Sequence, residues 1–220
     1  MTQVERAAAD EPRLDRRQRR RRQTVAEILA VALEVMGEEG VAGLSLSEVA
    51  RRMDIQPPSL YKYFSSKLAV YDALFAEGVR QQKAAVEAVV KGVEPGLPAL
   101  RAGTAAVVRW SVEHPVLAQL LFWRPVPGFE PSPEAFAPAV EVMDDTRRVI
   151  QDTIDRSQLH PDAASERGLA LFTCLIGGVI SQQLANEPGA GFAAGRFTAL
   201  TPEVVELFVR RYPPEEDPSP

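Results

Sequence analysis

The stretch that most constrains this chain is LSLSEVARRMDIQPPSLYKYF, residues 44–64. Ser45 followed three residues later by Glu48 is the signature of a capping box, so a helix is expected to begin here. Residues 54–56 break the helical pattern. Pro57 and Pro58 then stand where a second helix would begin, a position that tolerates proline because its missing N–H would be unpaired there. The stretch therefore predicts two short helices joined by a tight turn.

The second predicted helix has an inner and an outer side. Leu60 and Phe64 are four residues apart, so both side chains can face the first helix. Pro58 and Lys62 then lie on the opposite side. A helix of seven or eight residues that presents small, hydroxylic, aromatic and basic groups outward suits insertion into the major groove of DNA, as the second helix of a helix-turn-helix.

Extended by two serines and Lys67, this segment reads LSLSEVARRMDIQPPSLYKYFSSK. It resembles the DNA-binding signature of TetR-type transcriptional regulators, over about residues 20–75. Asp54 stands where that family usually has glycine, but aspartate tolerates a left-handed backbone better than most residues, so the turn is expected to form. Pro58 stands where the family often has a small residue. The resemblance implies an all-α protein with an N-terminal three-helix helix-turn-helix DNA-binding domain and a C-terminal helical ligand-binding and dimerisation domain.

The residue types of this segment divide into two kinds of DNA contact. Gln56 and Lys62 are candidates for base edges, because glutamine pairs with adenine and lysine with guanine. The remaining candidates suit phosphate contacts or shape the surface between them: Ser45, Pro57, Pro58, Ser59, Tyr61, Tyr63 and Lys67. Two alternatives stay open at this stage. In the first, Tyr61 is a partly buried core residue rather than a phosphate contact. In the second, Lys67 is an exposed lysine with no partner.

The domain boundaries follow from changes in composition. Residues 1–20 are expected to be a disordered basic arm, since residues 13–22 hold seven arginines and one acid. That arm lies along DNA or is a solvated tail. Residues 21–66 form the helix-turn-helix domain and residues 67–212 the helical second domain. The Pro- and acid-rich tail, residues 213–220, is expected to be disordered. Helices are predicted over 22–39, 66–91, 97–113, 116–123, 133–158 and 162–186, and a last helix begins at Thr201. Ser65 is expected to cap the helix over 66–91, and Thr201 is expected to cap the last one.

The net charge of −5 does not argue against a nucleic-acid partner. Residues 1–75 hold 12 Lys and Arg against 11 Asp and Glu, so the acidic excess lies in the rest of the chain. Because charges are screened beyond about 8 Å at physiological salt, a basic N-terminal part can bind DNA independently of the acidic remainder.

An enzyme is the competing class, and the sequence offers little for one. His114 and His160, the two histidines, each precede a proline, and Cys174 lies in the most apolar predicted helix, where a buried inert thiol is expected. Asp144 and Asp145 are adjacent, so their carboxylates point about 100° apart on a helix and do not easily share a metal. We therefore predict no catalytic site, no metal site and no cofactor.

The second predicted domain is rich in aromatic residues, and core packing explains most of them. The resemblance implies a small-molecule pocket among its helices, for which Trp110, His114 and Met143 are the candidate lining residues. Gly177 and Gly178 interrupt an apolar helix, which favours close approach of another helix. The resemblance implies that the last two helices are the homodimer interface, and the alternative is that the glycines face the helix over 66–91 or a pocket.

The predicted partners are double-stranded DNA, a second copy of the chain and a small apolar effector of unknown identity, with no membrane. No run of 18 apolar residues is present, and the arginine-rich start is not a secretory signal. With Cys174 as the only cysteine, a reducing cytoplasm is the expected compartment. The function expected is a repressor that binds a palindromic operator as a homodimer. The alternatives are a transcriptional activator, a DNA-binding dimer without ligand control, and a helix-turn-helix that contacts protein.

Overall fold

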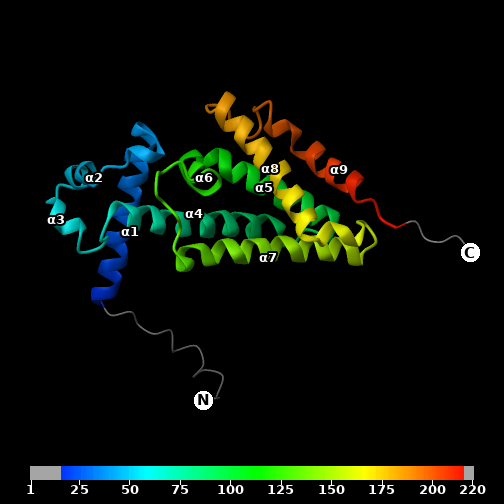
Figure 1. Cartoon of the computed structure of the whole chain (residues 1–220), viewed down its shortest axis with the longest axis horizontal. Coiled ribbons are helices and arrows are strands. Elements are labelled where there is room, and N and C mark those ends of the chain that lie inside the picture. Colours follow the sequence, from blue (N-terminus) through cyan, green and yellow to red (C-terminus); the bar gives the residue numbers. More distant parts are fainter. Residues whose placement is uncertain (1–15, 216–220) are drawn as a thin grey trace, which may run out of the picture. The chain divides into compact units, whose positions relative to one another are not determined.

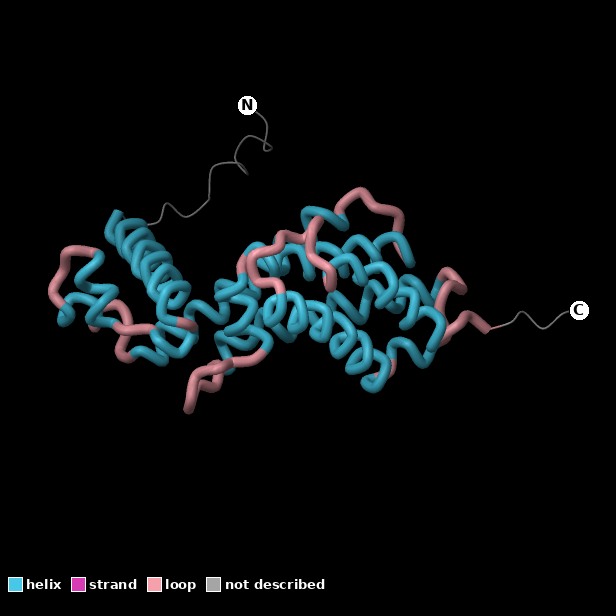
Figure 2. The backbone as a smooth tube through the Cα atoms, turned by 90° about the horizontal axis from the view of Figure 1, so that it is seen from above, coloured by secondary structure: helices cyan, strands magenta, loops and turns pink. Residues whose placement is uncertain are grey.

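Helices form every regular element between residues 16 and 215, the range described by this structure, a computed structural model (Figure 2). The predicted all-α class is confirmed. The chain divides into two compact units, with the boundary between Val70 and Tyr71, inside helix α4 (Lys67–Val90). We call the part before this boundary unit 1 and the part after it unit 2.

Unit 1 is built on a long first helix, α1 (Arg16–Glu39), followed by the short η2 (Val41–Gly43), α2 (Leu46–Arg52) and α3 (Pro57–Leu60). Its core is formed by apolar residues spaced along these helices, which are almost wholly buried: Ile28, Ala32, Val35, Met36, Val49, Ala50 and Leu60. Each helix is too short or too polar to be stable alone, so this shared core holds the unit together.

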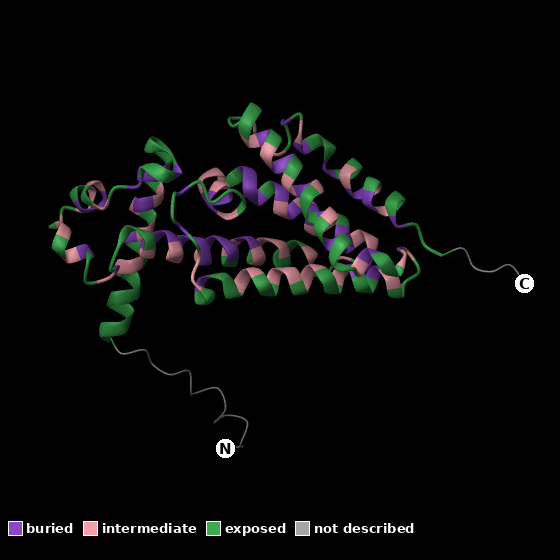
Figure 3. Ribbon diagram, viewed as in Figure 1, coloured by how far each residue is buried: buried purple, intermediate pink, exposed green. Residues whose placement is uncertain are grey.

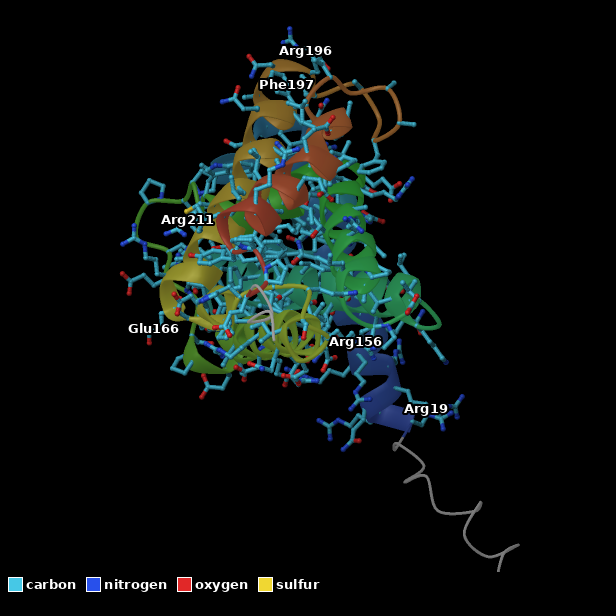
Figure 4. The ribbon with its side chains drawn as sticks, turned by 90° about the vertical axis from the view of Figure 1, so that its right-hand side faces the viewer. Arg19, Arg156, Glu166, Arg196, Phe197 and Arg211 are labelled. Atoms are coloured by element: carbon cyan, nitrogen blue, oxygen red, sulfur yellow. The ribbon has the colours of Figure 1, made fainter. Side chains whose placement is uncertain are left out.

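The predicted disorder of the basic arm is wrong from Arg16 onward. Arginine is a good helix former, and a helix already packed further along extends at little cost, so α1 begins six residues before the predicted start. The six arginines between Arg16 and Arg22 are exposed, and Figure 4 shows the side chain of Arg19 extending away from α1. Residues 1–15 of the predicted arm, and residues 216–220 of the predicted tail, lie outside the described residues.

Three local predictions need correction. Ser66, rather than Ser65, caps α4, since its Oγ accepts a hydrogen bond from the Ala69 N–H at 3.2 Å. Thr201 does not cap α9 (Thr201–Arg211), because its hydroxyl donates instead to the Thr198 carbonyl of the preceding turn η4 (Thr198–Leu200) at 2.7 Å. The second helix of the helix-turn-helix, α3, is four residues long rather than seven or eight.

Unit 2 contains the remainder of α4 and five further α-helices among the described residues. These are α5 (Leu97–Glu113), α6 (Pro115–Phe122), α7 (Pro133–Asp155), α8 (Glu166–Asn186) and α9, with η3 (Pro161–Ala164) before α8. Helix α5 packs against α8 and α9, and Figure 1 shows α7 running alongside α4. The bounds of α5 match the prediction, while α7 ends and α8 begins within a few residues of it.

Helix α8 is long and apolar enough to cross a membrane by length and composition alone. Packing explains part of that composition, because Phe172, Ile176 and Ile180 are buried in the core shared with α5 and α9, while 39% of the apolar window is buried in all. Not every side of the helix is covered, as Figure 3 shows. The predicted burial of Cys174 is wrong, since this residue lies on an exposed side of α8.

Candidate functional site

A network of charged side chains fixes the first helix of the helix-turn-helix. The Ser45 Oγ accepts a hydrogen bond from the Glu48 N–H at 3.4 Å, as the sequence predicts. The Glu48 carboxylate accepts hydrogen bonds from Arg51 at 2.7 Å and from Arg52 at 2.8 Å, and Arg52 also reaches Glu38 of α1 at 2.6 Å. The hydrogen bonds from Arg51 and Arg52 lower the pKa of Glu48 to about 2. A salt bridge between Arg52 and Glu38, as well as apolar packing, thus holds helix α2 against α1.

Asp54 closes α2 in a left-handed conformation, with φ of 53°. Its N–H donates to the Arg51 carbonyl at 3.2 Å, and the Ile55 N–H donates to the Ala50 carbonyl at 3.0 Å. This pair of bonds is the Schellman motif, which satisfies carbonyls left unpaired at a helix end. The backbone reverses here and leads directly into α3.

The recognition segment, residues 56–64, has one side that is buried in unit 1 and one side that is exposed. Leu60 and Phe64 are 1% and 8% exposed and pack into unit 1. Tyr61 is 55% exposed, so the alternative in which it is a core tyrosine is wrong. The predicted contact residues divide by exposure, with Pro57, Ser59 and Tyr63 half-buried and the others exposed: Gln56, Pro58, Tyr61 and Lys62, together with Ser45 and Lys67 outside the segment.

The regular helix of this segment stops at Leu60, but the chain continues to turn. The Tyr63 N–H donates to the Leu60 carbonyl at 2.8 Å and the Phe64 N–H donates to the same oxygen at 3.0 Å. One carbonyl therefore serves two donors, which tightens the last turn. As a result Tyr61 and Lys62 project from a tight turn at the end of α3.

Arg21 supports this turn and was not singled out by the sequence. Its guanidinium lies over the ring of Tyr63, 5.3 Å from the centroid, and its Nη1 donates to the Lys62 carbonyl at 3.3 Å. The only sequence signal was the arginine run, which does not say which arginine packs and which stay solvated.

Lys67 stands in the first turn of α4. Its Nζ donates to the Ala42 carbonyl at 3.4 Å, so the alternative of an exposed lysine with no partner is wrong. The residue is exposed, and its ammonium stays near the N-terminal end of α4, where backbone N–H groups favour an anion.

Unit 2 contains a cavity of about 1030 Å³. Residues of α4, α5, α7 and α8 form most of its wall, with a smaller part from the end of α6. Met143 lines it, as proposed from the sequence, but Trp110 and His114 are not among its wall residues. Trp110 is 4% exposed and stacks on His114 with ring centroids 4.9 Å apart, one turn beyond Val107 of the wall. Trp110 and His114 therefore fill space next to the cavity rather than border it.

The two consecutive glycines of α8 face open space. A Cβ placed on Gly177 or Gly178 would meet no atom within 4 Å. Neither glycine lines the cavity of unit 2 described above, so the alternative in which they face α4 or that pocket is wrong. Leu207 of α9 is also 54% exposed, so the last two helices both present uncovered apolar or small residues.

The carboxylates considered for a metal are engaged with cations. Asp144 accepts a hydrogen bond from Arg147 at 3.0 Å, and Asp145 contacts Arg148 and Lys83. Between residues 16 and 215, no group of three or more metal-ligating side chains comes together.

Two family models match this chain. The model of bacterial regulatory proteins of the tetR family matches residues 28–74, and that of the tetracyclin repressor-like C-terminal domain matches residues 100–208. The HTH-type transcriptional regulator Rv1816 of Mycobacterium tuberculosis is 28% identical over 130 residues, 57% of this chain and 54% of that protein. The match thus spans about half the length of this curated relative. The class A tetracycline repressor from Escherichia coli is 40% identical over 47 residues, 21% of this chain and 22% of the repressor.

Solved structures share the fold over most of the chain. A tetR-family regulatory protein from Rhodococcus RHA1 aligns with a TM-score of 0.65 at 21% identity, over 87% of this chain and 98% of that one. The regulator FadR from Bacillus subtilis, in complex with stearoyl-CoA, aligns with a TM-score of 0.59 at 16% identity, over 84% and 97%. RolR, in complex with resorcinol, aligns with a TM-score of 0.61 at 15% identity, over 90% and 91%.

Proposed function

Because this chain belongs to the TetR family of bacterial transcriptional regulators, we propose that it is a repressor that binds a palindromic operator as a homodimer and releases it when a small molecule enters unit 2. Membership places the chain among DNA-binding regulators rather than among enzymes. The observation that carries the proposal is the recognition segment, whose apolar side is buried while Gln56, Tyr61 and Lys62 are exposed together.

In this proposal Gln56 and Lys62 read base edges, while the hydroxyl groups and Lys67 fix the position of the protein on the phosphates. Arg21 keeps the turn of the recognition segment in one conformation by packing on Tyr63. The other exposed arginines of α1 supply positive charge for the flanking phosphates. The compartment is the cytoplasm, where the operator DNA lies.

A homodimer follows from the small size of one recognition segment. Four helical residues and a turn contact few base pairs, whereas a two-fold pair doubles the contacts and reads an inverted repeat. The exposed sides of α8 and α9 support pairing there, because Gly177 and Gly178 leave room for a second helix at van der Waals distance. Covering Leu207 of α9 adds apolar area to the same interface.

Ligand control follows from the continuity of α4. Its first turn carries Lys67, and its later turns form one wall of the cavity. A molecule that binds better to one position of α4 shifts the population toward that position and changes the spacing of the two recognition segments. A few kcal/mol of differential affinity are enough to release DNA. Ligand complexes of structural neighbours, with stearoyl-CoA for FadR and resorcinol for RolR, support a ligand role for such a unit.

The test is a titration of labelled duplex DNA with the full chain, followed by fluorescence anisotropy at several salt concentrations. A DNA binder loses affinity steeply as salt rises, with a log–log slope of about −0.9 for each phosphate contact. Weak binding with a slope near zero would instead favour a helix-turn-helix that contacts protein. Repeating the titration over a library of apolar compounds tests ligand control. If no compound changes the affinity for DNA, the alternative of a DNA-binding dimer without ligand control is favoured.

A further inference from the structure

One polar group on the cavity wall has no hydrogen-bond partner among the described residues. Gln82 of α4 is 7% exposed, and its Nε2 is buried without a bond. Buried polar atoms in folded proteins are almost always paired. Gln183 shows the usual arrangement, because its Nε2 donates to the Glu187 carbonyl at 2.9 Å and its Oε1 accepts from the Phe197 N–H at 3.2 Å. Gln82 is therefore a residue of the cavity wall whose amide nitrogen this chain leaves covered and unpaired.

The hydroxyl groups of the same wall are already committed as donors. Thr104, Thr146 and Thr173 donate to carbonyls of their own helices at 2.8, 2.8 and 3.0 Å. They keep lone pairs but have no second proton to offer. The ligand atom that meets the Gln82 amide nitrogen must accordingly be a hydrogen-bond acceptor.

Charge on the wall does not favour an anion. Lys83 of α4 is half-buried and forms salt bridges with Glu141 at 2.7 Å and with Asp145 at 3.3 Å. A ligand carboxylate would have to displace these acids as well as lose its own water, which is costly away from solvent. The other basic residues of the wall are exposed to solvent: Lys91, Arg124, Arg147 and Arg148.

The remainder of the wall is built for an apolar body. Phe75 and Val79 of α4 face Phe136 and Val140 of α7, and the rings of Phe75 and Phe136 stack with centroids 6.1 Å apart. Phe136 and Val140 are 42% and 50% exposed although both line the cavity. Covering this apolar surface is favourable for any molecule that displaces water from it.

We propose that the cavity binds an uncharged, mainly apolar molecule bearing a carbonyl or ether oxygen, and that the side chain of Gln82 turns so that its covered Nε2 donates a hydrogen bond to this oxygen. The inference rests on the proposed ligand role of unit 2 and adds the chemical class of the ligand and the residue that selects it. Gln82 selects for the oxygen, the paired Lys83 gives no advantage to an acid, and the aromatic walls set the apolar remainder.

The experiment uses the full chain and the neutral fluorescent dye N-phenyl-1-naphthylamine as a reporter of the cavity. Three competitors that share a ten-carbon chain are compared at pH 7.5: methyl decanoate, decanoate and decyltrimethylammonium. The ester is expected to displace the dye at the lowest concentration. In the Gln82→Leu variant the ester should bind about 3- to 10-fold more weakly, the worth of one neutral hydrogen bond. The dye should still bind, since leucine keeps the wall apolar.

Gln81→Leu is the matched control. Gln81 is the neighbouring residue of α4, bonds to Glu77 at 3.0 Å and does not line the cavity, so its loss should leave ester binding unchanged. Equal or tighter binding of decanoate, or an unchanged ester affinity in Gln82→Leu, overturns the ligand class while the proposed ligand role stands. Failure of the dye and all three competitors to bind overturns the ligand role itself, and this inference with it.

Discussion

The turn between α2 and α3 offers a direct test of how this helix-turn-helix is built. Asp54 occupies the left-handed position of the Schellman motif with φ of 53°, where any residue with a Cβ is strained by about 1–2 kcal/mol. Glycine removes that strain but loses about 0.5–1 kcal/mol more backbone entropy on folding. We expect Asp54→Gly to stabilise unit 1 by roughly 0.5–1 kcal/mol. Asp54→Val should destabilise it by about 1 kcal/mol or more, because a β-branched residue is an outlier at this φ.

Hydrogen exchange measured by mass spectrometry is the suitable assay, because peptides covering residues 46–64 report on unit 1 alone. A change of 1.4 kcal/mol is tenfold in an equilibrium constant, so Asp54→Gly should slow exchange of these amides by about 2- to 5-fold. The matched control is Asp152→Gly, an exposed site within α7, where glycine should destabilise by a few tenths of a kcal/mol. If Asp54→Gly also speeds exchange, the left-handed turn is not what limits this unit.

Three further results are expected. Replacing Lys67 by alanine should weaken binding to all DNA sequences alike and reduce the slope of log affinity against log salt by about 1.8 per dimer. Replacing Lys62 by alanine should instead relax discrimination at one base by about 1–3 kcal/mol. Anisotropy titrations on duplexes of varied sequence separate the two effects. Since the folded pKa of Glu48 is about 2 and lies below its ordinary 4.5, its stabilising contribution is complete above pH 4.5 and should be lost as the pH falls toward 2. Amide exchange in α2 between pH 5 and 2 should show this loss, and Glu48→Gln should flatten it. Leu207→Asp should shift a dimer toward monomer in sedimentation velocity, and an unchanged sedimentation coefficient would place the interface elsewhere.

The local chemistry of the helix-turn-helix could be predicted from sequence because short-range rules govern it. The cap at Ser45, the left-handed Asp54 and the burial of Leu60 and Phe64 all depend on neighbours within a few residues. The length of α3 could not be predicted this way. Two prolines start a helix well, but the length of the helix also depends on the Leu60 carbonyl, which accepts from the N–H groups of both Tyr63 and Phe64.

Features that depend on distant partners were missed. Arg21 is one of several arginines in a row, and only the folded chain shows which of them lies over Tyr63. Residue type favours Trp110 and His114 as cavity residues, yet the space they occupy is set by where α5 meets its neighbours. Gln82 belongs to no sequence motif, and its buried, unpaired amide nitrogen is found only once burial and bonding are known together.

The most direct test of the central claim is selection of bound fragments from a pool of random duplex DNA by the full chain. We expect enrichment of an inverted repeat, because two copies of the recognition segment present the same contacts in opposite directions on one duplex. The enriched bases should change with Lys62→Ala and persist with Lys67→Ala. Enrichment of no sequence, or of a single unrepeated site, would contradict operator binding by a two-fold pair.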